Sequence, residues 1–91
     1  MQVVHPTADV HATARILGRG NVQIGAYCSV EAAVVIDLGT NRSSRFVLGS
    51  RSKLKTGTII KCYGNAVLVG HRVTIGDYST LSGHGGLEIG D

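Results

Sequence analysis

Apolar residues recur every six positions along this chain, and this spacing limits the possible fold more than any other feature. A first register comprises Val4, Val10, Ile16, Val22, Cys28 and Val34. A second comprises Ile24, Val30 and Ile36 and, after an interruption at Arg42, Leu48, Leu54 and Ile60. A six-residue period matches neither an α-helix nor an ordinary strand. It indicates a solenoid, in which each unit buries its apolar side chains only by stacking on its neighbours.

A four-residue motif accompanies the repeat: an apolar residue, any residue, an aliphatic residue and glycine. It occurs as VQIG at 22–25, FVLG at 46–49, VLVG at 67–70, VTIG at 73–76 and LEIG at 87–90. The alternation within the motif is that of a short strand, and the glycine after it permits a tight turn. No apolar stripe with helical spacing persists. The sequence therefore predicts an all-β parallel solenoid of triangular cross-section, with one strand and one turn per six residues.

The repeat slips at three places, which are LGRGN (17–21), KCYGNA (61–66, about three extra residues) and SGHGG (82–86, about two extra). Such slips map to loops that protrude from one corner of a solenoid and often carry binding groups. In the first turn, the repeat predicts that Val4, Val10 and Ile16 point inward and share one ladder. Ala8 and Ala14 are predicted to lie at corners, and His5 and His11 are predicted to point outward.

Charge and cysteine placement narrow the classes of partner. Between Asp37 and Asp77 there is no acidic residue, but there are seven basic ones: Arg42, Arg45, Arg51, Lys53, Lys55, Lys61 and Arg72. This basic stretch forms either a solvated outer face or a docking surface for an anionic group such as phosphate. The stretch lacks an aromatic series for base stacking, so we expect no nucleic-acid partner.

The two cysteines, Cys28 and Cys62, fit no CxxC pattern. We therefore expect buried free thiols in the reducing cytoplasm rather than a zinc or redox site. No stretch approaches the roughly 20 apolar residues of a membrane-spanning segment, so we expect no membrane span.

The repeat resembles the bacterial transferase hexapeptide repeat, which runs aliphatic residue, often glycine, two free positions, a small residue and one free position. Three units fit it most closely: Ile24-Gly25 with Cys28, Leu48-Gly49 with Ser52, and Ile75-Gly76 with Ser79. The resemblance covers nearly the whole chain. It implies one domain over residues 1–91, folded as a single-stranded left-handed parallel β-helix of about 18 residues per coil, and hence about five coils. Left-handed winding is opposite to the usual handedness of parallel crossovers.

The resemblance also implies an activity. The commonest reaction in this family is acyl transfer from acyl-CoA, or acyl carrier protein, to a hydroxyl or an amine, and the later half of the chain is most similar to sugar O-acetyltransferases. The implied co-substrate is acetyl-CoA or another acyl-CoA, without a tightly bound cofactor, and the implied acceptor is a small sugar-like molecule. The family further implies a homotrimer with active sites between neighbouring subunits. An end-to-end assembly is the alternative that an open apolar end would favour, and the free cysteines favour a cytoplasmic location.

Acyl transfer requires a base that removes the proton from the attacking hydroxyl or amine, and histidine suits this role near neutral pH. His84 lies in the slip SGHGG and is flanked by Gly83, Gly85 and Gly86. These small neighbours leave room for a substrate and offer backbone N–H groups to an oxyanion. We predict His84 as the catalytic base and the three glycines as substrate- or cofactor-binding residues. The alternative is a glycine-rich turn with an exposed histidine.

His71 and Arg72, in VGHRV, are further candidates for substrate or cofactor binding. His71 should point outward and line a cleft, and Arg72 belongs to the basic stretch that would meet CoA phosphates; the alternative for both is a solvated surface. The gamma-class carbonic anhydrases, which are related to this family, bind zinc through three histidines. His71 and His84 are 13 residues apart, and no histidine follows. The close pair of ligands is therefore absent, and we predict no metal site.

Full-length relatives continue past the segment that matches LEIGD, with further coils and a C-terminal cap. The resemblance therefore implies either a short version of the enzyme or the N-terminal part of a longer one. Two functions remain open, namely an acyltransferase (or part of one) and a non-catalytic β-solenoid that serves assembly. In either case the sequence predicts an open apolar end that another copy or a swapped segment covers.

Overall fold

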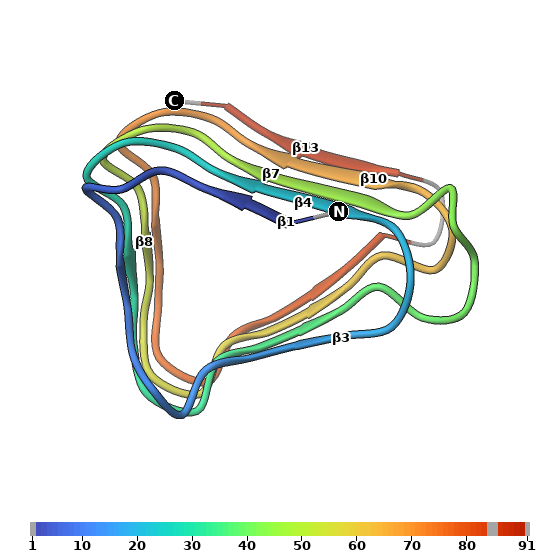
Figure 1. The fold of residues 1–91 in the computed structure, drawn as a ribbon, viewed down its shortest axis with the longest axis horizontal. Helices are drawn as coiled ribbons and strands as arrows, with labels where there is room; N and C mark the ends of the chain where they lie inside the picture. The colour runs from blue at the N-terminus through green and yellow to red at the C-terminus, as the bar shows by residue number, and fades with distance from the viewer. Residues whose placement is uncertain (1, 84–85, 91) are drawn as a thin grey trace.

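The chain forms a parallel β-solenoid with a triangular cross-section in a computed structural model that describes residues 2–83 and 86–90 (Figure 1). The described residues form thirteen short strands and no helix. No membrane-crossing helix is therefore found among them. The coils wind in the left-handed sense (Figure 1). The predicted fold class, an all-β left-handed parallel β-helix, is confirmed.

Each side of the triangle is a parallel sheet, and the coils contribute to it one strand each. The first sheet contains β1 (Gln2–Val4), β4 (Asn21–Ile24), β7 (Arg45–Leu48), β10 (Ala66–Val69) and β13 (Leu87–Ile89). The second contains β2 (Asp9–Val10), β5 (Ser29–Val30), β8 (Lys53–Leu54) and β11 (Thr74–Ile75). The third contains β3 (Arg15–Leu17), β6 (Val35–Asp37), β9 (Ile59–Lys61) and β12 (Thr80–Ser82).

The strand register gives the length of each coil. Val4 pairs with Ile24, Ile24 with Leu48, Leu48 with Val69, and Val69 with Ile89. Successive coils therefore contain 20, 24, 21 and 20 residues, more than the uniform length of about 18 that the resemblance implies. Because the coils are longer, the described residues complete four of them and add only β13 from a fifth, rather than about five whole coils.

All variation in coil length lies at one corner of the triangle. Corner 1 (residues 5–8, 25–28, 49–52 and 70–73) and corner 2 (residues 11–14, 31–34, 55–58 and 76–79) have four residues in every coil. Corner 3 joins the third sheet to the first sheet of the next coil and comprises residues 18–20, 38–44, 62–65 and 83–86. Figure 1 shows its longest loop, 38–44, protruding from the triangle. The slips predicted to protrude from one corner are thus confirmed at corner 3.

Inward side chains stack from coil to coil and form the core. Its fully buried centre includes Phe46, Leu54 and Ile60, one from each sheet of the same coil. The prediction that Val4, Val10 and Ile16 share one ladder is wrong, because they pair with different partners: Ile24, Val30 and Ile36. The six-residue repeat runs around a coil, whereas a ladder runs along the axis, so each of the three begins its own ladder.

Small residues at the corners hold the turn of the next coil. The Ser52 hydroxyl donates to the Gly70 carbonyl at 2.7 Å, and the Cys28 thiol donates to the Gly49 carbonyl at 3.0 Å. A larger side chain would not fit between the turns, which explains the small position of the repeat. The corners of the first coil hold, as predicted, the partly buried residues Ala8 and Ala14.

Candidate functional site

The glycine-rich segment predicted to hold the catalytic base lies at corner 3, between β12 and β13. The N–H of Gly86 donates to the Gly83 carbonyl at 2.9 Å and closes a turn. His84 and Gly85 lie outside the described residues, so their roles stay predictions. The N–H groups of the two described glycines, expected as oxyanion donors, are engaged within the fold, since that of Gly83 donates to the Lys61 carbonyl at 2.7 Å.

Gly83 itself is explained by packing. It is buried, and a β-carbon at this position would lie 2.7 Å from Cγ2 of Val67 and 3.1 Å from the carbonyl oxygen of Cys62. Val67 is fully buried in the ladder of the first sheet. The core therefore fills the space beside Gly83, and this contact requires glycine whether or not a ligand binds nearby.

His71 lies at corner 1 and joins two coils. Its Nδ1 accepts a hydrogen bond from the backbone N–H of Ser50 at 2.9 Å and lies 2.9 Å from the Ser50 hydroxyl. A backbone N–H can only donate, so Nδ1 must be the acceptor, and a neutral ring then carries its proton on Nε2. In this arrangement Nε2 donates and cannot remove a proton from a substrate. His71 is exposed, as predicted, but its geometry suits the positioning of a turn rather than general base catalysis.

His5 and His11 point outward, as predicted. Like His71, they position turns, and they do so at corners 1 and 2 of the first coil. Nδ1 of His5 accepts the Thr7 N–H at 3.2 Å, and the Thr7 hydroxyl in turn accepts the N–H of Tyr27 in the next coil at 2.9 Å. His11 and Thr13 repeat the arrangement one corner later. The recurrence of histidine with the repeat therefore reflects turn geometry, which sequence reasoning had no means to assign.

Arg72 lies beside His71 in an open groove of about 470 Å³ that is also lined by Ser50 and Arg51. The guanidinium carbon of Arg51 lies 5.0 Å from the centroid of the Tyr27 ring, within cation–π range. The groove could accept an anionic group through its arginines. It lies at corner 1, however, whereas the glycine-rich segment 83–86 lies at corner 3. Within one chain, the structure does not bring these two sets of predicted site residues together.

The basic stretch does not form one surface, because its 31 residues wrap more than once around the triangle. Its members are spread over all three corners and all three sheets: Arg51 and Arg72 at corner 1, Lys55 at corner 2, Arg42 at corner 3, and Arg45, Lys53 and Lys61 on the first, second and third sheets. As a whole, the stretch is a solvated exterior.

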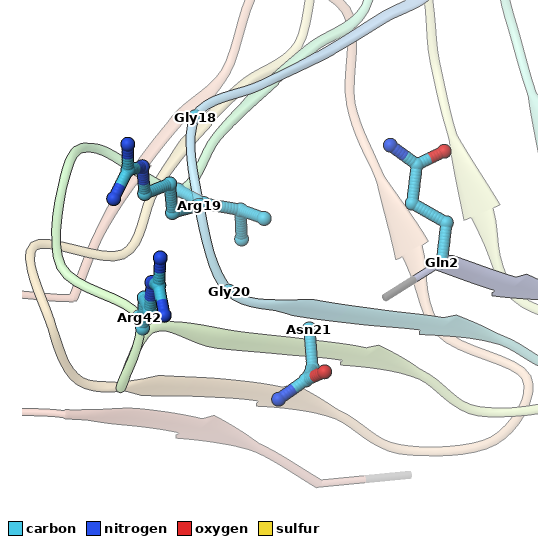
Figure 2. A pocket seen from close by; sticks show the side chains of 7 residues that line it. Gln2, Gly18, Arg19, Gly20, Asn21 and Arg42 are labelled. Atoms are coloured by element: carbon cyan, nitrogen blue, oxygen red, sulfur yellow. The ribbon is translucent and has the colours of Figure 1, made fainter.

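Sequence reasoning missed a hollow beside corner 3. It has a volume of about 800 Å³ and is lined by Gln2, Gly18, Arg19, Gly20, Asn21, Leu38 and Arg42. Figure 2 shows Arg19 and Arg42 on the outer side of the segment from Gly18 to Gly20, with Gln2 on the other side. The slip at 17–21 was the available signal, but nothing in the sequence placed Arg42 beside it.

The two cysteines are free and buried, as predicted. Burial raises the pKa of Cys62 to about 11, and the carboxylate of Asp37 adds to the effect. A thiol with this pKa stays protonated at neutral pH and is a poor nucleophile. Cys62 therefore acts as a small apolar residue of corner 3.

Among residues 2–83 and 86–90, no three side chains of His, Cys, Asp or Glu gather closely enough to hold a metal ion. No family model, curated protein or solved structure matches this chain. The fold and the geometry of its corners are therefore the features that bear on function.

Proposed function

We propose that this chain forms all or part of a hexapeptide-repeat acyltransferase, which transfers an acetyl or other acyl group from acyl-CoA to a hydroxyl or amine of a sugar-like acceptor. The observation that carries the proposal is the left-handed β-solenoid with its extra residues at corner 3, the corner that also holds Gly83 and Gly86, the described glycines of the predicted site. The repeat motif adds support through its resemblance to this family. The proposal includes that the chain acts as a homotrimer in the bacterial cytoplasm.

In the proposed reaction, His84 removes the proton from the acceptor hydroxyl, whose oxygen attacks the thioester carbonyl carbon. The tetrahedral oxyanion then collapses, the carbon–sulfur bond breaks, and the proton on His84 passes to the leaving CoA thiolate. His71 has a positioning role, because its Nδ1 holds the backbone of Ser50. This division of roles assigns proton transfer to one histidine and structure to the other.

The test measures thiol release from acetyl-CoA in the presence of sugar acceptors. Wild-type protein should release CoA, and His84→Ala should lose at least about 100-fold in rate, as expected for the loss of a general base. His5→Ala is the matched control, because His5 is exposed and lies at corner 1. Loss of the rate in both variants, or in neither, would contradict the assignment of His84.

A second candidate function, a non-catalytic solenoid that serves assembly, is favoured by the apolar first coil. Val4 and Val10 are 40% and 38% exposed, and they border a hollow of about 310 Å³ whose walls also include Ile16, Ile24 and Val30. Analytical ultracentrifugation distinguishes the two functions together with the CoA assay. Assembly without CoA turnover would favour the second candidate, and a clean monomer at micromolar concentration would exclude it.

A further inference from the structure

Two arginines from successive coils lie at corner 3 without a counter-charge of their own. Arg19 belongs to the short loop 18–20, and Arg42 belongs to the long loop 38–44 that stacks on it. Both line the 800 Å³ hollow, and no carboxylate is among its lining residues. Within the part of the chain that the structure describes, neither arginine forms an ion pair or a side-chain hydrogen bond.

The backbone beneath both arginines is held firmly. The N–H of Arg19 donates to the Gly39 carbonyl at 2.8 Å. Gly18 has a φ of +90°, and a β-carbon there would collide with the backbone of Gly39. The two loops are therefore in close backbone contact that only glycine permits.

The long loop is also tied internally and to the coil that follows. The side-chain oxygen of Asn41 accepts the N–H of Ser43 at 2.8 Å, and the buried Ser44 hydroxyl accepts the N–H of Gly64 at 2.8 Å. The nearest acidic residue along this loop, Asp37, accepts the N–H of Gly39 through Oδ1 at 2.9 Å and so stabilises the turn. These bonds fix the loop that carries Arg42, so its guanidinium is presented from a prearranged backbone.

Two guanidinium groups that line one hollow without a carboxylate among its walls give it a positive potential, which favours a bound anion. Arginine remains protonated at all physiological pH values and binds phosphoryl oxygens through paired N–H donors. We propose that Arg19 and Arg42 bind the pyrophosphate group of a nucleotide, with one arginine facing each phosphoryl group. Both CoA and nucleoside diphosphates carry this group. The site does not depend on acyl transfer, so it holds for either candidate function.

The corner 1 groove is a weaker candidate for the same ligand. There Arg51 already stacks on Tyr27, and Nδ1 of His71 already accepts from Ser50. The polar groups of that groove are therefore partly satisfied within the protein, in contrast to the arginines of corner 3.

Isothermal titration calorimetry at low salt tests the proposal with three probes: inorganic pyrophosphate, CoA and uridine diphosphate. Wild-type protein should bind at least one nucleotide more tightly than pyrophosphate alone. Arg19→Gln and Arg42→Gln should each weaken that binding by about tenfold or more, because each removes a charge-assisted contact. Lys53→Gln is the matched control, since it removes one exposed positive charge from the second sheet.

The three probes distinguish which molecule supplies the bound pyrophosphate group. Tighter binding of CoA would assign the site to the acyl donor, and tighter binding of uridine diphosphate would assign it to a nucleotide-linked acceptor. Binding of pyrophosphate alone, binding that survives both arginine substitutions, or equal weakening by Lys53→Gln would each overturn the proposal. Circular dichroism spectra check that all variants are folded. We expect them to be, because the substituted side chains are exposed.

Discussion

Replacing Gly83 by alanine tests whether this glycine is required by packing. The new methyl group would lie 2.7 Å from Cγ2 of Val67, well inside van der Waals contact, and 3.1 Å from the Cys62 carbonyl oxygen. Val67 is fully buried and β-branched, so it has little freedom to move aside. Overpacking of this kind costs about 1–3 kcal/mol of unfolding free energy. Gly90→Ala is the matched control, because a β-carbon there has no neighbour within 4 Å, and we expect a change within about 0.5 kcal/mol.

A double-mutant cycle makes the test specific. Val67→Ala alone should cost about 2–3 kcal/mol through lost burial and a cavity. In the double variant the methyl at position 83 fills part of that cavity, so the combined loss should fall short of the sum by about 1–2 kcal/mol. Urea unfolding followed by far-ultraviolet circular dichroism measures all four proteins. Unchanged stability of Gly83→Ala, or additivity within about 0.5 kcal/mol, would refute the packing argument.

Three further perturbations test other contacts. Burial raises the pKa of Cys62 from 9.0 to about 11, so the folded state keeps a proton that the unfolded state loses. Stability should therefore fall by about 2 kcal/mol as the pH rises from 9 to 11, and urea titrations of Cys62→Ala should lack this component. Ser52→Ala leaves partly buried backbone groups of Gly70 and Val73 without their partner and should cost about 1–3 kcal/mol in thermal or urea unfolding, whereas exposed Ser43→Ala should cost little. Ala33 has a φ of 59°, so Ala33→Val should lower stability by about 1 kcal/mol or more, and Ala33→Gly should not.

The solenoid could be predicted from the sequence because its core is periodic. The slips near residues 61–66 and 82–86 were correctly sized at three and two residues, since coils three and four contain 21 and 20 residues. The largest insertion escaped notice because it is six residues long. The second coil has 24 residues, one whole period more than a coil of about 18, so Leu48, Leu54 and Ile60 return to phase. Arg42 then looks like one interrupted position, although it lies in a seven-residue loop.

A separate slip explains why the surroundings of Arg19 could not be foreseen, because the first coil contains 20 residues, two more than a coil of about 18. A uniform coil of about 18 residues would place Asp37 beside Arg19 and neutralise it. In the actual register Asp37 pairs with Leu17, and Arg19 contacts Gly39 instead. The turn-capping roles of His5, His11 and His71 were equally out of reach, because they depend on which ring nitrogen faces a neighbouring backbone N–H.

Cross-linking of engineered cysteines tests most directly whether the second coil carries a whole extra repeat unit at corner 3. Gln23 and Val47 are register partners on β4 and β7, so the variant with Gln23→Cys and Val47→Cys should form a disulfide under mild oxidation. A uniform coil of about 18 residues would instead place Gln23 beside Asn41. A second variant, with Gln23→Cys and Asn41→Cys, tests that alternative. Mass spectrometry should find the 23–47 cross-link in the first variant and no 23–41 cross-link in the second. The reverse result would contradict the register on which corner 3 and its arginine pair depend.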